Sequence, residues 1–231
     1  MENENCWFTK LTLLDYPGKA ACTIFTSGCN FRCPFCHNAS LVVGELDAKI
    51  EERELFVFLK KRQGLLDGVC VSGGEPLLQE DIEELIGKIK DLGYLVKLDT
   101  NGSLPKKLQS LIDKQLIDYV AMDIKNSKEH YFATSGTDKV PLEYIEESAN
   151  ILMNNKLPYE FRTTVVKELH TAEDFLAISK WLSPASPYFL QAFVDSGDVI
   201  GENYHAHSKE DMEHFLGIVR KNLPLAALRG I

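Results

Sequence analysis

Residues Cys29–Asn38, with the sequence CNFRCPFCHN, sit directly after the strand-like run Ala20–Thr26. Three thiols, those of Cys29, Cys33 and Cys36, fall within this stretch and can close on one metal centre. Thiolates select zinc, copper(I) or iron–sulfur clusters, and a structural zinc site needs a fourth Cys or His ligand. The CxxxCxxC spacing therefore favours a four-iron cluster in which one iron has no protein ligand.

Two other interpretations of the cysteines stay open at this point. Cys33 and Cys36 form a CxxC pair that could act as a redox dithiol, and His37 could complete a small structural zinc site. The rest of the chain has to supply the context that separates them.

Composition describes an ordinary globular protein. The chain has 231 residues, of which 45% are hydrophobic and 26% charged, and this suits one domain over residues 1–231. A net charge of −9 argues against nucleic acid as a partner. The first five residues are polar and acidic, unlike a signal peptide, and no apolar run is long enough to span a membrane, so we expect a cytoplasmic protein that does not bind membranes.

Short apolar runs alternate with longer amphipathic runs along the chain. The expected strands are Ala21–Thr26, Gly68–Ser72, Leu95–Asp99, Tyr119–Ile124, Tyr159–Val166 and Tyr188–Phe193. The expected helices are Ile50–Arg62, Gln79–Leu92, Leu104–Lys114, Leu142–Asn154, Ala172–Leu182 and Lys209–Asn222. Strict alternation predicts an α/β fold, a partial (β/α)6 barrel of the TIM type with parallel strands, preceded by an extended segment and a turn over Lys10–Lys19.

Polar residues stand at the carboxyl ends of the predicted strands, where parallel α/β folds place their chemistry. They are Gly73, Gly74, Glu75, Asp99, Asn101, Asp123, Lys125, Arg162 and Gln191. Paired glycines permit close approach of a ligand, and the Glu75 carboxylate could accept a hydrogen bond from a ligand ammonium group. Plain turns, helix caps and ion pairs are the alternative explanations.

The remaining cysteines and histidines have simpler explanations. Cys22 and Cys70 lie in apolar runs and are expected in the core. Five histidines are expected to be exposed and polar, namely His130, His170, His205, His207 and His214. His37 follows Cys36 directly and should face whatever the cysteines bind.

The cysteine motif resembles the radical S-adenosylmethionine (SAM) superfamily, whose signature CxxxCxΦC has an aromatic residue at the position of Phe35. The resemblance implies one [4Fe–4S] cluster on Cys29, Cys33 and Cys36, with SAM on the remaining iron. Too few thiols are left for a second cluster. It also implies that the Gly-Gly-Glu-Pro segment, with Gly73, Gly74 and Glu75, holds the amino group of SAM.

Activating enzymes for glycyl-radical enzymes have similar D-T-N-G and D-x-K segments. By this resemblance Asp99, Asp123 and Lys125 contact SAM, and the two aspartates help to bind a monovalent cation. The cofactor-binding set that follows also includes Phe35, Cys36, His37, Asn101, Arg162 and Gln191, although Arg162 and Gln191 could equally pair with neighbours.

Leu11–Lys19 together with Phe25–Asn38 looks like the short activating proteins of anaerobic ribonucleoside-triphosphate reductases. This similarity implies reductive cleavage of SAM, a glycyl radical formed on a partner enzyme, and flavodoxin or ferredoxin as electron donor. No side-chain general base is needed. Tyr131, Phe132 and the loop 195–207 could line the path of the partner's glycyl loop.

Two alternative functions remain. One is a radical SAM enzyme that acts on a small molecule, as in 7-carboxy-7-deazaguanine synthase. The other is a binding module in which an iron–sulfur or zinc site carries electrons or stabilises a complex.

Overall fold

The computed structural model describes residues 6–43 and 51–231. The chain divides into two compact units. Unit 1 comprises Met1–Cys29, Ser40–Thr100 and Lys106–Val120, and unit 2 comprises Asn30–Ala39, Asn101–Pro105 and Ala121–Ile231.

Unit 1 is built on four strands that follow one another in chain order. They are β1 (Cys6–Thr12), β2 (Ala21–Thr26), β3 (Gly68–Gly73) and β4 (Leu95–Thr100). β1 is antiparallel to β2, while β2, β3 and β4 are parallel to one another. The turn predicted at the end of the leading segment is present, since the Lys19 amide donates to the Tyr16 carbonyl over 3.1 Å.

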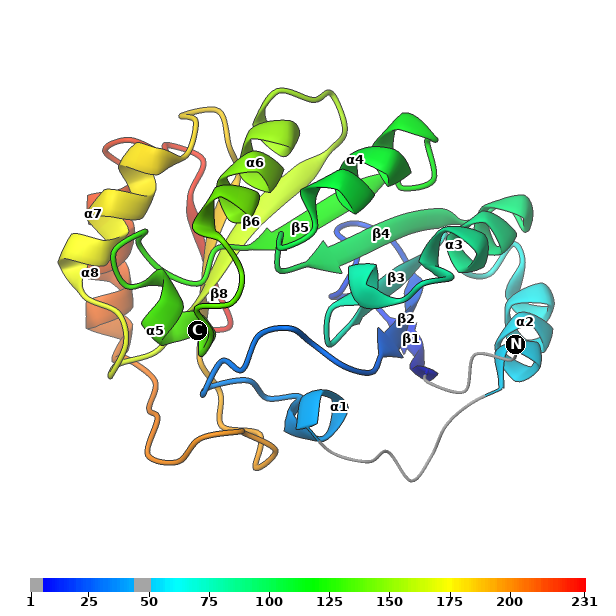
Figure 1. Cartoon of the computed structure of the whole chain (residues 1–231), viewed down its shortest axis with the longest axis horizontal. Coiled ribbons are helices and arrows are strands. Elements are labelled where there is room, and N and C mark those ends of the chain that lie inside the picture. The colour runs from blue at the N-terminus through cyan, green and yellow to red at the C-terminus, as the bar shows by residue number, and fades with distance from the viewer. Residues whose placement is uncertain (1–5, 44–50) are drawn as a thin grey trace. The chain divides into compact units, whose positions relative to one another are not determined.

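Helices return the chain between these strands. They are α1 (Ala39–Val43), α2 (Glu52–Arg62), the 3₁₀ turn η1 (Pro76–Leu78), α3 (Ile82–Asp91) and α4 (Pro105–Asp113). α3 buries Ile82, Leu85, Ile86 and Ile89, which share one helical face. α2 and α3 are neighbours (Figure 1), joined by an ion pair of 2.7 Å between Lys88 and Glu52.

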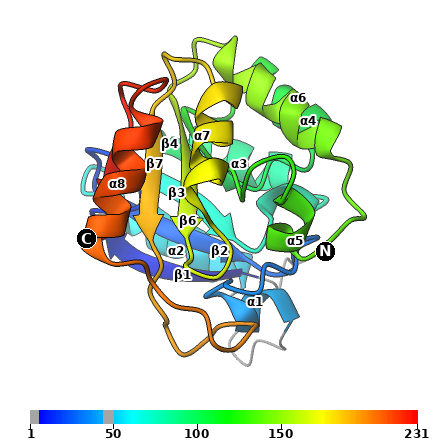
Figure 2. The same ribbon diagram turned by 90° about the vertical axis from the view of Figure 1, so that its left-hand side faces the viewer.

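Unit 2 carries the later strands β6 (Tyr159–Val165), β7 (Tyr188–Ala192) and β8 (Ala227–Arg229), all parallel. Its helices are α5 (Tyr131–Ser135), α6 (Leu142–Met153), α7 (Ala172–Trp181) and α8 (Lys209–Val219). Figure 2 shows α7 and α8 side by side, as does Figure 1. A capping box of Thr171 and Asp174 begins α7.

β5 (Tyr119–Asp123) has residues in both units. In unit 1 the amide of Asp118, just before it, donates to the Val96 carbonyl over 2.8 Å, and in unit 2 the amide of Ile124, just after it, donates to the Arg162 carbonyl over 2.9 Å. Strands β2 to β7 are the six that the sequence predicts, and β2 to β4 in unit 1 and β6 to β8 in unit 2 are parallel, so the α/β fold with parallel strands is confirmed.

In the described part of the chain, α1, η1, α5 and β8 were not predicted, and β1 begins at Cys6 rather than at Lys10, the start of the predicted leading segment. The helices α1 and α5 have five residues each, and β8 has three. Such short segments carry too little periodicity to be recognised. The predicted start of the helix Ile50–Arg62 lies outside the described residues. No helix in the described ranges is long and apolar enough to cross a membrane.

Candidate functional site

The Gly73-Gly74 pair in unit 1 is a place where two backbone segments meet. A Cβ on Gly74 would lie 1.9 Å from the Gly28 carbonyl oxygen, and one on Gly73 would lie 2.4 Å from the Thr26 amide nitrogen. Gly73 also has a φ of +111°, which favours glycine. The amides of Gly74 and Glu75 donate to the Thr26 and Gly28 carbonyls over 2.8 and 2.9 Å. These glycines therefore hold the backbone that leads directly into Cys29.

Glu75, the next residue, has a fully buried side chain. Its Oε1 accepts a hydrogen bond from the Leu77 amide at 3.1 Å and another from the Thr100 hydroxyl at 2.8 Å. One carboxylate oxygen thus caps η1 and ties it to the end of β4. A capping role was not part of the sequence prediction for Glu75.

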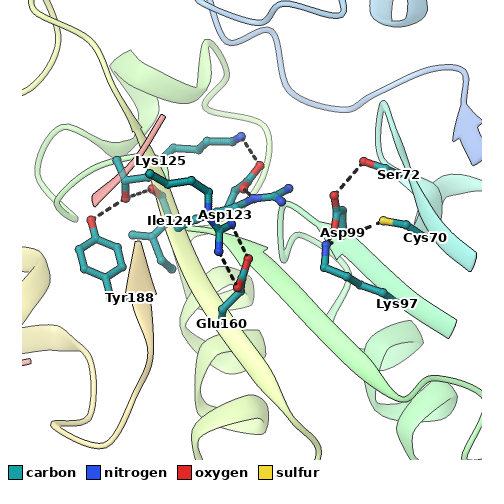
Figure 3. A network of polar contacts seen from close by, with 12 residues as sticks. Cys70, Ser72, Lys97, Asp99, Asp123, Ile124, Lys125, Glu160 and Tyr188 are labelled. Carbon is teal, nitrogen blue, oxygen red and sulfur yellow. Dashed lines mark hydrogen bonds and ion pairs between the residues drawn. The ribbon is translucent and has the colours of Figure 1, made fainter. Parts of the chain in front are cut away.

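Asp99 lies on the face of β4 that also carries Lys97, and Ser72 and Cys70 stand beside them on β3 (Figure 3). The Ser72 hydroxyl donates to Asp99 Oδ2 over 3.0 Å, and the Lys97 ammonium group forms an ion pair with Oδ1. Lys97 was missed in the sequence analysis. A lysine between Val96 and Leu98, inside a predicted strand, was the signal that could have identified it.

Residues 30–38, which carry Cys33 and Cys36 and are called the cysteine loop below, lie in unit 2 and are held by backbone hydrogen bonds. The Cys36 amide donates to the Cys33 carbonyl over 3.0 Å, which closes a turn across the CxxC pair. The Arg32 amide donates to the Ser135 carbonyl over 2.9 Å at the end of α5. Both Cys33 and Phe35 are buried.

Asn101 reaches this loop through a side-chain network. Its amide group donates to Asn30 Oδ1 over 2.9 Å, and the Asn30 amide group donates to the Ser103 hydroxyl over 2.8 Å. The Ser103 backbone amide returns to Asn101 Oδ1 over 2.9 Å. These contacts fix the start of the cysteine loop, a positioning role for the D-T-N-G segment.

Asp123, Lys125 and Arg162 form a cluster of charges at the ends of β5 and β6. Lys125 Nζ lies 2.9 Å from Asp123 Oδ2, and Arg162 Nε lies 2.5 Å from Asp123 Oδ1. Burial opposes ionisation of Asp123, yet the charges and hydrogen bonds of Arg162 and Lys125 outweigh it and hold the pKa of Asp123 far below its usual range. Burial likewise opposes the charge of Lys125, but mainly the Asp123 charge raises the Lys125 pKa. Figure 3 shows Asp123 and Lys125 next to each other.

Electrostatics link this cluster to the cysteine loop. Burial lowers the pKa of His37, and the positive charge of Lys125 lowers it further. The thiolate charge of Cys33 is one of the groups that raise the pKa of Lys125. In unit 2 the charge of Lys125 therefore acts on His37, and the charge of Cys33 acts on Lys125.

A strap formed by residues 195–207 packs on the same loop. The Gly201 amide donates to the Pro34 carbonyl over 2.7 Å, and the Ile200 amide donates to the Cys36 carbonyl over 3.3 Å. At its other end, His205 binds Glu168, with Nδ1 2.8 Å from Oε1. The strap therefore braces the cysteine loop.

The expectation for the histidines was wrong at two positions. His170 is 2% exposed, because it stacks on Phe175 and because its Nε2 donates to the Lys125 carbonyl over 2.8 Å. The Val166 amide donates to His170 Nδ1, which places the proton on Nε2. The His207 side chain is 9% exposed and packs edge-on against Phe215. The other three histidines are exposed as expected.

Tyr131, Phe132 and Gln191, which the sequence analysis placed at the site, differ in how far they are exposed. Tyr131 is 1% exposed and cannot line an open path, whereas Phe132 is 40% exposed. Gln191 is half-buried on β7, beside Thr164 of β6 and Arg229 of β8. Neither its predicted cofactor contact nor a rim pairing is tested by these positions.

A buried ion pair was also missed. Glu160, which is 1% exposed, receives two hydrogen bonds from Arg229, of 2.8 and 3.0 Å. Figure 3 shows Glu160 on β6, and the Arg229 guanidinium also stacks 3.9 Å from the centre of the Phe189 ring. Because Arg229 belongs to the unpredicted strand β8, the sequence offered no way to pair it.

The cysteines have the chemistry of metal ligands. The described cysteines form no disulfide, and Cys22 and Cys70 are buried in the core as predicted. Among residues 6–43 and 51–231, no group of three His, Cys, Asp or Glu side chains is arranged around one metal ion. Thiolates that bind different irons of a cluster stand farther apart than ligands of a single ion.

The chain is similar to one protein family and to several proteins of known name. Residues 23–182 match the Radical SAM superfamily. A relative in Methanocaldococcus jannaschii, named as an inferred glycyl-radical enzyme activating enzyme, is 35% identical over 79% of this chain and 77% of its own length. A 7-carboxy-7-deazaguanine synthase of Methanopyrus kandleri is 31% identical over 48% of this chain and 51% of its own length.

Among solved structures, a domain of the pyruvate-formate lyase-activating enzyme of Bacteroides vulgatus has a similar fold. It aligns with a TM-score of 0.55 at 17% identity, over 71% of this chain and 99% of the other.

Proposed function

The chain belongs to the radical SAM superfamily of enzymes, and on this premise we propose that it activates a glycyl-radical enzyme. Superfamily members use a [4Fe–4S] cluster and SAM. We take residues 1–231 as one radical SAM domain, because the family match over residues 23–182 has residues in both compact units. The observation that best supports the proposal is the relative in Methanocaldococcus jannaschii, named as an inferred glycyl-radical enzyme activating enzyme, which is 35% identical over 79% of this chain.

Cys29, Cys33 and Cys36 are the proposed cluster ligands. The donor set fits, since three cysteines outside any disulfide offer soft ligands and leave one iron without a protein ligand. The ammonium group of Lys125 near Cys33 favours an anionic centre there. Bound and reduced, such a cluster supplies the electron for reductive cleavage of SAM.

Other residues of the chain would bind and orient SAM. Lys125 and Arg162 offer positive charge for its carboxylate, while Asp99 and Asp123 offer acceptors for its hydroxyl groups. The remaining members of the proposed set are Phe35, His37, Gly73, Gly74, Glu75, Asn101 and Gln191. Several of them also position the backbone, because Gly73 and Gly74 pack on the segment of Thr26 and Gly28 in unit 1 and Asn101 bonds to Asn30 in unit 2. Buried Phe35 would help to exclude water.

We further propose an anaerobic ribonucleotide reductase as the partner, a glycine of that enzyme as the hydrogen donor, and flavodoxin or ferredoxin as the electron source. Activity would take place in the cytoplasm. The support is the relative in Methanocaldococcus jannaschii together with the Leu11–Lys19 and Phe25–Asn38 segments.

Electron paramagnetic resonance tests the proposal. The protein with its cluster reconstituted is mixed anaerobically with SAM, dithionite and the anaerobic ribonucleotide reductase of the same organism. A glycyl doublet on the reductase is the expected result. Cysteine-to-alanine substitution at Cys33 should abolish it. A sample with a full cluster and SAM that forms no 5′-deoxyadenosine would contradict the enzymatic proposal, and cleavage without the doublet would contradict the choice of partner.

A small-molecule reaction is the second candidate. Its support is the similarity to the 7-carboxy-7-deazaguanine synthase, which covers about half of each chain. Formation of 7-carboxy-7-deazaguanine from a small-molecule precursor, at a rate above that of SAM cleavage alone, would favour it over activation of a protein.

A further inference from the structure

Lys97 is a charged side chain in the interior of unit 1. It is 1% exposed, and its ammonium group forms an ion pair with Asp99 and lies 3.8 Å from the sulfur of Cys70. Taking an ammonium group out of water is unfavourable unless a partner compensates for it. The Asp99 carboxylate is the partner that compensates for the buried ammonium charge of Lys97.

The partner of Lys97 is one of the residues proposed to serve SAM. Asp99 is 12% exposed at its side chain, and its two carboxylate oxygens accept from Lys97 and from the Ser72 hydroxyl. Lys97 and Asp99 share a face of β4 because they are two residues apart, and Cys70 pairs with Lys97 across the sheet. The position of Lys97 is thus set by the sheet itself (Figure 3).

These contacts disagree with the monovalent cation that the family resemblance implies. A site for such an ion needs carboxylate charge that is not already neutralised. In unit 1 the negative charge of Asp99 is balanced by Lys97. In unit 2 Asp123 already has two cationic partners, Lys125 and Arg162. Neither carboxylate fits as the ligand of an added cation.

We propose that the Lys97 ammonium group takes the place of the monovalent cation beside Asp99. Lys97 is then a positioning residue, which keeps the Asp99 carboxylate ionised and fixes its direction. The use of that carboxylate rests on the proposed SAM site. The charge compensation itself does not, so it can be tested in the protein without cluster and SAM.

Thermal unfolding in different chloride salts is the test. Midpoints are measured in potassium, sodium and tetramethylammonium chloride at one ionic strength, which keeps screening constant. Wild-type protein should unfold at the same temperature in all three. Lys97→Ala removes the ammonium group from Asp99 and opens space for an ion. That variant should gain about 5 °C in saturating potassium relative to tetramethylammonium.

The double variant Lys97→Met/Asp99→Asn is the control, because it removes both charges and should again unfold independently of the cation. A saturable potassium effect on the wild-type midpoint would overturn the proposal. So would a folded Lys97→Ala variant with no response to potassium. If Lys97→Ala does not fold, the wild type and the double variant still test the proposal. A potassium-dependent unfolding midpoint in either protein would contradict the replacement of an ion by Lys97.

Discussion

Alanine at Gly74 should destabilise the protein even before any cofactor binds. The new Cβ would lie 1.9 Å from the Gly28 carbonyl oxygen and 2.7 Å from the Gly28 carbonyl carbon. Both are backbone atoms, so no side-chain rotation relieves the overlap. One of the two segments must withdraw, and the segment of Gly28 leads into Cys29.

The expected loss in free energy of unfolding can be estimated from the contacts that this backbone displacement would disrupt. Overpacking in a closely packed region costs about 1–3 kcal/mol, and an immovable backbone neighbour puts Gly74 at the upper end. The hydrogen bonds from Gly74 to Thr26 and from Glu75 to Gly28, of 2.8 and 2.9 Å, would be strained as well. Each contributes about 1 kcal/mol. We therefore expect the free energy of unfolding to fall by about 3–5 kcal/mol, which is a fall of about 6–20 °C in the midpoint.

Gly87→Ala is the matched control. Gly87 lies inside α3, and a Cβ there would have no neighbour within 4 Å. Alanine at that position should be neutral or stabilising by about 0.5–1 kcal/mol, because it favours the helix. Both variants are unfolded thermally without cluster and SAM, with circular dichroism as the measurement.

The comparison separates two reasons for a glycine at position 74. If Gly74 serves only close approach by a ligand, Gly74→Ala would unfold within a degree or so of wild type and lose only SAM binding. That result would refute the packing argument.

Three further predictions concern other parts of the molecule. Arg229→Leu leaves the buried Glu160 carboxylate without its bidentate partner and should lower the free energy of unfolding by about 3 kcal/mol in urea titration, whereas an unchanged midpoint would show that the pair is dispensable. Burial lowers the pKa of His170, so neutral His170 contributes stability above the ordinary histidine pKa, and this stability is lost as the pH falls. Below pH ~6.5 the free energy of unfolding of the wild type should fall by up to about 1.4 kcal/mol per pH unit more than that of His170→Gln. Parallel pH profiles of the two proteins would contradict this prediction. Gly201→Ala, whose Cβ would lie 3.0 Å from the Pro34 carbonyl oxygen, should speed hydrogen exchange of the cysteine-loop amides, while Gly217→Ala in α8 should not; equal exchange in both variants would argue against the brace.

The sequence by itself determined the six parallel strands, the cysteine motif and the residues at the strand ends. Each is a local property. Ala21–Thr26 is buried along almost its whole length and so reads as a continuous apolar run, and its predicted bounds agree with β2. Asp99 and Asp123 stand at the ends of such runs, and this position alone identifies them as candidate site residues, although their contacts in space are unknown at that point.

Only the tertiary structure decided what those residues contact. Glu75 accepts from Thr100, His170 donates to the Lys125 carbonyl, and the strap lies on the cysteine loop. Each contact joins residues at least 25 positions apart, and nothing in the local pattern distinguishes a buried His170 from an exposed one. The physical reason is that a buried polar group must find a partner wherever packing brings one, and packing is a property of the whole chain.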